Sequence, residues 1–336
     1  NRTIGERLYS KLVGPAGTVE WEYVDPVTRA EIRRTFSIAA SRFREHAKAM
    51  IEDDVAYGRS LWASGECFDR AGDVDMAIIS FGEYSAGRPS DPRRFGARFR
   101  LAQAHQARGD FTMAADLYRS LIKDDPSSGE RFRSIVPLVQ CILADTDPAN
   151  DAEGEQMLQQ MLAGGMSPEA PEFRLALNEL GALYYRSARY PQAIERLTES
   201  LERFPTAHDA SMIRYMLADA LRLSSAQIGA SLALAMPQAQ RQELSALRDQ
   251  RLAQALTLYQ EICDSSVDRD LRRMSELDLI ALRNAFFYRA DCAFDLGRYE
   301  QAIDYYDAAA NRYANDAASL VAMIQIVNAY AQTGRM

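Results

Sequence analysis

Lysine, cysteine, histidine and long apolar runs are all scarce in this chain of 336 residues. The only lysines are Lys11, Lys48 and Lys123, so positive charge comes almost entirely from arginine, as in proteins from GC-rich bacterial genomes. The net charge is −8, which argues against a general nucleic-acid binder because phosphate attraction needs a basic face. The arginine-rich segment 88–100 is interpreted as an exposed turn and a helix whose phenylalanines pack inward. No run of about 18 apolar residues occurs, so the sequence predicts no membrane-spanning helix.

Signals for catalysis and for metal or cofactor binding are also scarce. The four cysteines are far apart and form no CxxC pair, so we expect packed thiols and no disulfide framework. The sequence contains no HExxH, GxSxG, P-loop or GxGxxG motif. We therefore predict a non-catalytic segment with no metal and no cofactor. The sequence begins at Asn1, so a leader or lipid anchor can precede it, and bacterial cytoplasm and periplasm both stay open as compartments.

Apolar residues recur at helical spacing, and short breaks at Gly-Asp, Gly-Arg or Asp-Pro separate the predicted helices. Four stretches, 61–89, 100–126, 175–205 and 286–314, repeat one pattern of small residue, turn residue, alanine and large residue at matching offsets. In the last stretch the pattern is Ala290, Gly297, Ala302 and Tyr306. Self-similarity at a period of about 34 residues indicates a helical repeat protein.

The pattern resembles the tetratricopeptide repeat, in which helix A, a tight turn and helix B form one unit. The resemblance implies an all-α fold, a right-handed superhelical solenoid of about six stacked antiparallel helix pairs. Small residues on both helices allow close approach, as at Ala290 and Ala302, and the aromatic Tyr306 fills the space toward the next repeat. Gly72 and Gly297 suit the positive backbone angle that follows helix A. Stacking buries the apolar face that each pair would otherwise expose.

The repeats give the predicted organisation of the chain. Residues 1–57 are expected to be a helical capping segment or degenerate repeat, with helices at 1–13 and 27–50 and a loop at 14–26, and 58–336 the array. Clear repeats are predicted near 58–91, 95–128, 174–207 and 283–316, a divergent pair at 129–170, a repeat with an insertion at 211–264, and a truncated repeat at 318–336. Because the pattern stops within a repeat, we expect the natural protein to continue beyond Met336.

The insertion, 224–250, is rich in alanine and glutamine and is predicted to lengthen both helices of its repeat. About 12 extra residues per helix would project a hairpin about 18 Å beyond its neighbours. Pro237 is expected in the first turn of the second helix. Apolar residues of the two helices are expected to contact one another across the hairpin: Ile228, Leu232, Leu234 and Met236 on one side, and Leu244 and Leu247 on the other. The sequence leaves open whether the hairpin only packs on itself or also makes a docking or oligomer contact.

In tetratricopeptide arrays one face of the A helices lies on the concave, ligand-facing side, and the resemblance transfers that role to matching positions here. The predicted partner-binding residues are Trp62, Glu66, Phe99, Gln103, Asn178, Tyr185, Arg186, Tyr215, Asp219, Arg222, Asn284, Phe287, Asp291 and Asn328, and Asp69, Phe294 and Ile324 occupy the same face. Amides and arginine can hydrogen-bond a peptide backbone or carboxylate, and aromatic rings add contact area at little entropic cost. Any solvated concave face also carries polar residues, so a purely structural role stays open.

We therefore predict a protein-interaction scaffold that binds a peptide or partner protein on its concave face. The lysine-based carboxylate clamp found in one subset of the family is not expected, because no lysine occupies these positions. Two alternatives remain: a periplasmic or outer-membrane-associated assembly factor, and a regulatory binding arm of a larger enzyme. The partner and the oligomeric state are left open.

Overall fold

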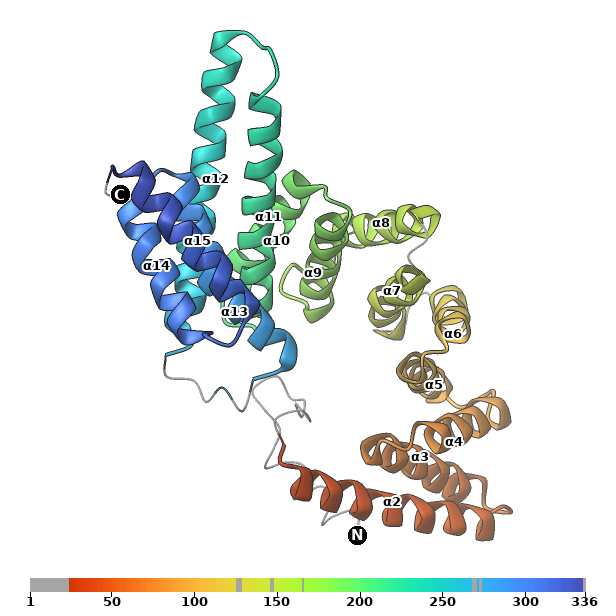
Figure 1. The fold of residues 1–336 in the computed structure, drawn as a ribbon. Helices are drawn as coiled ribbons and strands as arrows, with labels where there is room; N and C mark the ends of the chain where they lie inside the picture. Colours follow the sequence, from red (N-terminus) through yellow and green to blue (C-terminus); the bar gives the residue numbers. More distant parts are fainter. Residues whose placement is uncertain are drawn as a thin grey trace. The chain divides into compact units, whose positions relative to one another are not determined.

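A computed structural model describes residues 24–124, 129–145, 148–164, 166–267, 271 and 274–334, and our expectations for residues 1–23 lie outside this range. Every element in the described part is helical (Figure 1). The first helices are α2 (Pro26–Ala49), α3 (Asp54–Ala71), α4 (Val74–Gly87), α5 (Arg94–Arg108), α6 (Phe111–Asp124), α7 (Gly129–Ile142), the short η2 (Leu143–Asp145) and α8 (Pro148–Ala163). They are followed by α9 (Pro171–Arg186), α10 (Tyr190–Arg203), α11 (Ala210–Leu232), α12 (Gln238–Ser265), α13 (Glu276–Asp295), α14 (Tyr299–Arg312) and α15 (Ala317–Gln332).

The contacts divide the chain into two compact units, Asn1–Glu179 and Leu180–Met336. Within each unit, helices that follow one another in the sequence pack together, as expected for a repeat array. The predicted repeat boundaries stay predictions. The predicted start of the array at residue 58 falls inside α3, and the division between the units falls inside α9.

In the first unit, the apolar face of α2 packs against α3. Ile32 and Phe36 of α2 are fully buried and share a core with Phe68 of α3 and with Phe81 and Tyr84 of α4. This is the face that the helical spacing of 27–50 predicts. The aromatic residues on helix B therefore fill the layer between successive repeats.

The small residues at the A–B crossings are required by close contact. A β-carbon added to Gly65 would lie 2.8 Å from the ring of Phe81, and one added to Gly181 would lie 2.6 Å from Leu197 Cδ2. At the matching position of the last repeat, Ala290 is fully buried. The repeated small residue thus sets how closely the two helices approach.

The turn after helix A has a left-handed backbone, as the glycine pattern predicts. Gly72, Gly109 and Gly297 have φ angles of 74°, 88° and 72°. The matching residue of the third clear repeat is Ala188, which adopts φ 56° and is the non-glycine residue with positive φ in the described chain. A left-handed conformation costs a residue with a β-carbon about 1–2 kcal/mol, so this turn is strained.

The insertion forms a helical hairpin in which α11 and α12 extend beyond α13 and α14 (Figure 1). Pro237 is the N-cap of α12, one position before the expected first turn. Ile228 is buried in the hairpin, but Leu234 is 67% exposed at the tip and makes no part of the expected apolar contact. The reason is that α11 ends at Leu232, where Arg241 of α12 donates to the Leu232 carbonyl at 2.7 Å.

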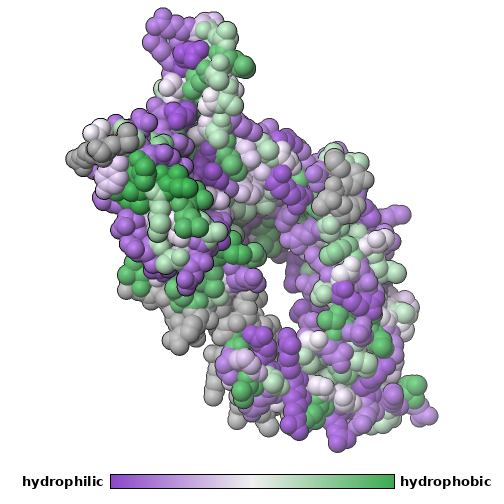
Figure 2. Space-filling model, in the orientation of Figure 1, coloured by the Kyte–Doolittle hydropathy of each residue, from purple (hydrophilic) through white to green (hydrophobic). Residues whose placement is uncertain are grey.

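The last helix, α15, leaves an apolar face uncovered. Val327 and Ile324 are 61% and 62% exposed, and Figure 2 shows hydrophobic residues gathered on this part of the second unit. Counted back from the turn glycines Gly334 and Gly297, Val327 matches Ala290, which α14 covers. Among the described residues, α15 therefore presents the kind of surface on which a helix B packs elsewhere in the array.

Candidate functional site

Polar contacts join successive A helices of the second unit. The Tyr185 hydroxyl on α9 donates to Asp219 Oδ2 on α11 at 2.5 Å, and Asn284 Nδ2 on α13 donates to the Tyr215 hydroxyl on α11 at 3.0 Å. All four residues belong to the predicted binding set. The structure thus brings part of that set together, on the successive A helices α9, α11 and α13.

Asp219 is the centre of this cluster and is only 4% exposed. Its Oδ1 accepts from Arg222 Nε at 2.9 Å, from Arg222 Nη2 at 2.5 Å and from the Tyr259 hydroxyl at 3.0 Å, while Oδ2 accepts from Tyr185. A carboxylate that accepts several hydrogen bonds and pairs with arginine is well stabilised when buried. Asp219 therefore serves as an acceptor for its neighbours and has little surface for a partner.

Arg222 is held in one orientation by two contacts. Its Nε and Nη2 pair with Asp219, and its Cζ lies 4.0 Å from the ring centroid of Tyr288 on α13. Burial acts to lower the pKa of Arg222, but the nearby Tyr259 and Asp219 outweigh it, so the pKa is raised and the guanidinium stays charged. The Nη1 nitrogen is not used by the pair with Asp219. An arginine fixed in this way loses little entropy when its outer edge binds a carbonyl or carboxylate.

Asp291 on α13 is a second, half-buried carboxylate beside this arginine. The Tyr306 hydroxyl of α14 donates to its Oδ1 at 2.6 Å. Burial raises the pKa of Asp291, and the Tyr306 hydrogen bond and the charge of Arg222 only partly oppose that shift. Asp291 thus adds a second carboxylate to the cluster, and its charged form is destabilised because water reaches it incompletely.

The remaining predicted residues of the second unit lie outside the cluster. Phe287 is 7% exposed, and its ring centroid lies 5.9 Å from that of Tyr313 in a tilted pair, so it is largely a core residue. Arg186 is exposed at the end of α9. Asn328 is exposed on α15, where its amide donates to Gln325 Oε1 at 2.9 Å. The ring that packs against Phe287 belongs to Tyr313, the C-cap residue of α14.

In the first unit, Arg100 joins two residues of the predicted face: its Nη1 donates to Gln103 Oε1 at 3.4 Å and lies 3.7 Å from Asp69 Oδ2. Trp62 is half-buried, edge-on to Phe81 at 5.8 Å and to Tyr84 at 5.5 Å. Phe99 is buried beneath the Arg133 guanidinium, whose Cζ lies 4.9 Å from the ring. Glu66, Gln103 and Asn178 are half-buried. The aromatic members of this set mainly pack against helix B.

Three tyrosines that complete the cluster of the second unit are absent from the predicted set: Tyr259, Tyr288 and Tyr306. Tyr259 and Tyr306 are on B helices, where the repeat pattern places a packing aromatic, and both are buried. Their hydroxyls are turned to Asp219 and Asp291. The available signal was the choice of tyrosine over phenylalanine, because a buried hydroxyl needs a partner.

The arginine-rich segment of the first unit is largely neutralised by acidic residues. Arg88 pairs with Asp54 and with Asp91, and Arg98 Nη1 lies 2.8 Å from Asp124 Oδ2. Because these arginines are paired with carboxylates, they attract a nucleic-acid phosphate less strongly than unpaired arginines would. They agree with the interpretation of 88–100 as a turn and a structural helix.

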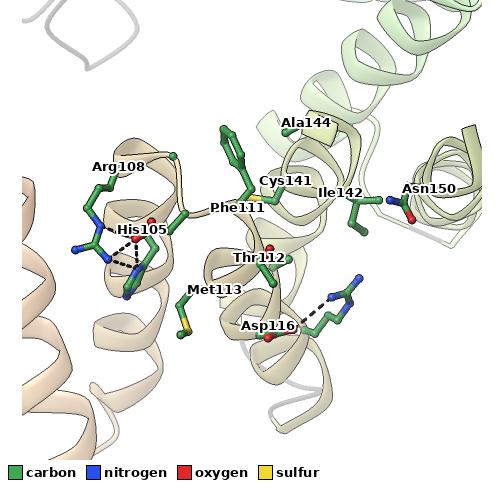
Figure 3. A pocket seen from close by; sticks show the side chains of 14 residues that line it. His105, Arg108, Phe111, Thr112, Met113, Asp116, Cys141, Ile142, Ala144 and Asn150 are labelled. Atoms are coloured by element: carbon green, nitrogen blue, oxygen red, sulfur yellow. Dashed lines mark hydrogen bonds and ion pairs between the residues drawn. The ribbon is translucent and has the colours of Figure 1, made fainter. Parts of the chain in front are cut away.

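A pocket of about 680 Å³ lies in the first unit, beside the α5–α6 turn (Figure 3). Phe111 and Met113 of α6 and Ile142 of α7 give it apolar walls, while Arg108 and Asp110 form an ion pair at its edge. None of the predicted binding residues lines it. Within the described residues, no group of three or more His, Cys, Asp and Glu side chains could hold a metal ion.

All four cysteines are buried, and none forms a disulfide. Burial raises the pKa of Cys141 and of Cys263 to about 11 each, so both thiols are protonated and unreactive near neutral pH. The expectation of packed thiols is confirmed. Among the described residues, no helix is both long and apolar enough to cross a membrane.

Comparison with known proteins identifies the repeat. Residues 97–128 and 284–316 match the family model described as tetratricopeptide repeat. The C-terminal part of a TPR repeat-containing protein from Cytophaga hutchinsonii is similar in structure, with a TM-score of 0.57 and 11% identity over 96% of this chain and 99% of that one. A tetratricopeptide repeat protein from Parabacteroides merdae is 15% identical, with a TM-score of 0.40 and coverage of 81% and 98%. A search of curated protein sequences finds no match.

The chain therefore contains tetratricopeptide repeats, and its fold is an all-α solenoid of stacked helix pairs, as predicted from the sequence. Arrays of this kind generally act as scaffolds for protein interaction and not as catalysts, because their extended surfaces suit binding. The likeness to solved structures concerns the fold alone.

Proposed function

We propose that the second unit binds an extended peptide or a partner protein along the A helices α9, α11 and α13, with Arg222 at the centre. The observation that supports this best is the fixed orientation of Arg222 between Asp219 and the Tyr288 ring. Holding a charged guanidinium partly buried and in one orientation costs free energy, and the packing of the helices does not require it. Binding of a peptide carbonyl or carboxylate would make use of it.

Two neighbouring groups widen the surface around Arg222. Asn284 keeps its amide on the same row of helices, and its Oδ1 accepts from Arg283 Nη2 at 3.0 Å while Nδ2 contacts Tyr215. Asp291 supplies an acidic group that would favour a peptide with a basic residue nearby. We propose that this segment acts by binding and carries out no catalysis, and that its partner is a protein or peptide and not a nucleic acid.

A peptide selection tests the proposal although the natural partner is unidentified. Peptides from a random displayed library are selected on the full chain, and their affinity is measured by fluorescence polarisation. We expect Arg222→Gln and Asn284→Ala each to weaken binding at least about tenfold, as central contacts do. Asp304→Ala, an exposed change on α14, is the matched control and should alter affinity less than about twofold. If all three variants bound the peptides equally well, the proposal that the A-helix face binds them would be wrong.

A further inference from the structure

Two arginines on the α12–α14 side of the second unit have no carboxylate partner in the part of the chain described here. Arg289 on α13 is 6% exposed, and its Nη1 donates to Gln260 Oε1 on α12 at 3.0 Å. Its Nε is buried without a hydrogen-bond acceptor. Arg312, at the end of α14, is exposed and forms no ion pair with the described residues. Neither arginine belongs to the cluster around Asp219.

One aromatic ring lies next to both guanidinium groups. The Cζ atoms of Arg289 and of Arg312 are each 4.8 Å from the ring centroid of Phe286. Arg289 also lies 4.3 Å from the ring of Tyr305, and Arg312 lies 5.9 Å from that of Tyr313. Contacts with aromatic rings offset only part of the cost of removing a charged guanidinium from water. A buried, positively charged residue of this kind is normally matched by an anion.

The acidic groups nearby do not supply that match. Asp264 accepts from the Gln260 amide at 2.7 Å, so it reaches Arg289 only through an intervening side chain. Asp316 pairs with a different arginine, Arg283, at 3.0 Å. Burial raises the pKa of Cys263, Arg289 and Arg312 act to lower it, and Asp264 acts to raise it, so all three charges lie within electrostatic range of this thiol. Among the described residues, this region therefore carries an excess of positive charge.

We propose that Arg289 and Arg312 form a binding site for a carboxylate, provided by an aspartate or glutamate side chain of a partner protein. Arg312 forms the exposed rim and makes the first contact, and Arg289 forms the floor, where a carboxylate oxygen offsets the uncompensated charge. A planar carboxylate suits the fork of donors on a guanidinium group. Phe286 between them gives an apolar surface for the aliphatic part of the acidic side chain. This site is independent of the A-helix face around Arg222.

Binding of a capped tetraglutamate peptide to the full chain tests the site directly. Titration calorimetry at low salt should show saturable binding, and a capped tetraglutamine peptide should not bind. Arg312→Gln should weaken the binding at least about tenfold. Arg298→Met is the matched control, because it removes an equally charged and exposed residue from the start of α14. It should change the affinity less than about twofold. No binding by the wild type, or an equal loss with Arg298→Met, would overturn the proposal.

Arg289→Met provides a second readout. Because methionine replaces an unpartnered buried charge, we expect this variant to unfold at a higher urea concentration than the wild type when no acidic peptide is present. It should also lose tetraglutamate binding. A folded Arg289→Met protein that binds the peptide like the wild type would show that Arg289 is not part of the site. Should the variant not fold, Arg312→Gln, at the exposed rim, still decides the question.

Discussion

Replacing Asp219 with alanine tests whether the polar cluster of the second unit holds that unit together. The substitution would leave the Arg222 guanidinium and the buried Tyr259 hydroxyl without their acceptor and would release Tyr185. Removing one partner of a buried ion pair costs about 3–5 kcal/mol, because the other charge stays buried alone. Tyr185→Phe removes a single hydrogen bond and should cost about 1 kcal/mol. Asp249→Ala, which breaks an exposed pair, should cost at most about 1 kcal/mol.

Urea unfolding of the full chain, followed by circular dichroism, measures these losses. Since each repeat contacts only its neighbours, hydrogen exchange should rise in α9, α11 and α12 and stay unchanged in α3 and α5. The double variant Asp219→Ala with Arg222→Met should recover part of the stability, because it also removes the orphaned charge. If Asp219→Ala cost no more than Asp249→Ala, the buried carboxylate would not be the organising group and our interpretation of the cluster would be wrong.

Four further substitutions test the repeat turns, the helix crossing and the carboxylate of Asp291. Ala188→Gly should stabilise the protein by about 0.5–1 kcal/mol, since relief of the left-handed strain exceeds the added chain entropy. Gly297→Ala should do the reverse, because its β-carbon would meet no atom and only the backbone would be strained; thermal unfolding compares the two. Asp291→Asn should stabilise the protein at pH 7. Burial raises the pKa of Asp291 in the folded protein, so the wild type loses stability as the pH rises through that raised pKa and the carboxyl ionises. Asparagine carries no charge and avoids this loss. The advantage should disappear in urea unfolding near pH 3, and a constant difference would contradict the argument. Gly181→Ala should cost about 1–3 kcal/mol by displacing Leu197, measured in the same urea assay.

The repeat and its turns could be predicted from the sequence because the same physical requirement recurs. A glycine or alanine at each helix crossing and a glycine after helix A are local features, and their spacing is visible in one dimension. Ala188 shows the limit of that logic. Its place in the pattern predicts the turn, but only the structure shows that an alanine there keeps the left-handed backbone instead of changing the turn.

The cluster around Asp219 could be predicted only in part. Tyr185 and Asp219 are 34 residues apart and lie on successive A helices. That spacing could have identified the contact. The role of Tyr259 could not be found in this way, because its hydroxyl reaches Asp219 from a lengthened B helix. The depth of burial of Asp219 and of Phe287 also depends on the packing of neighbouring helices and not on their positions in the repeat.

Burial separates residues that could touch a partner from residues that orient them. Asp219 is nearly inaccessible, and its substitution would disturb Arg222 and Tyr185 together, so lost binding in that variant would not identify a contact. Arg222 and Asn284 are only half-buried, and a partner can reach them. A variant at either residue that loses binding while the free energy of unfolding stays constant would identify a true contact. Equal losses in both quantities would instead mean that the residue acts through the fold, so the two measurements must be made on the same protein.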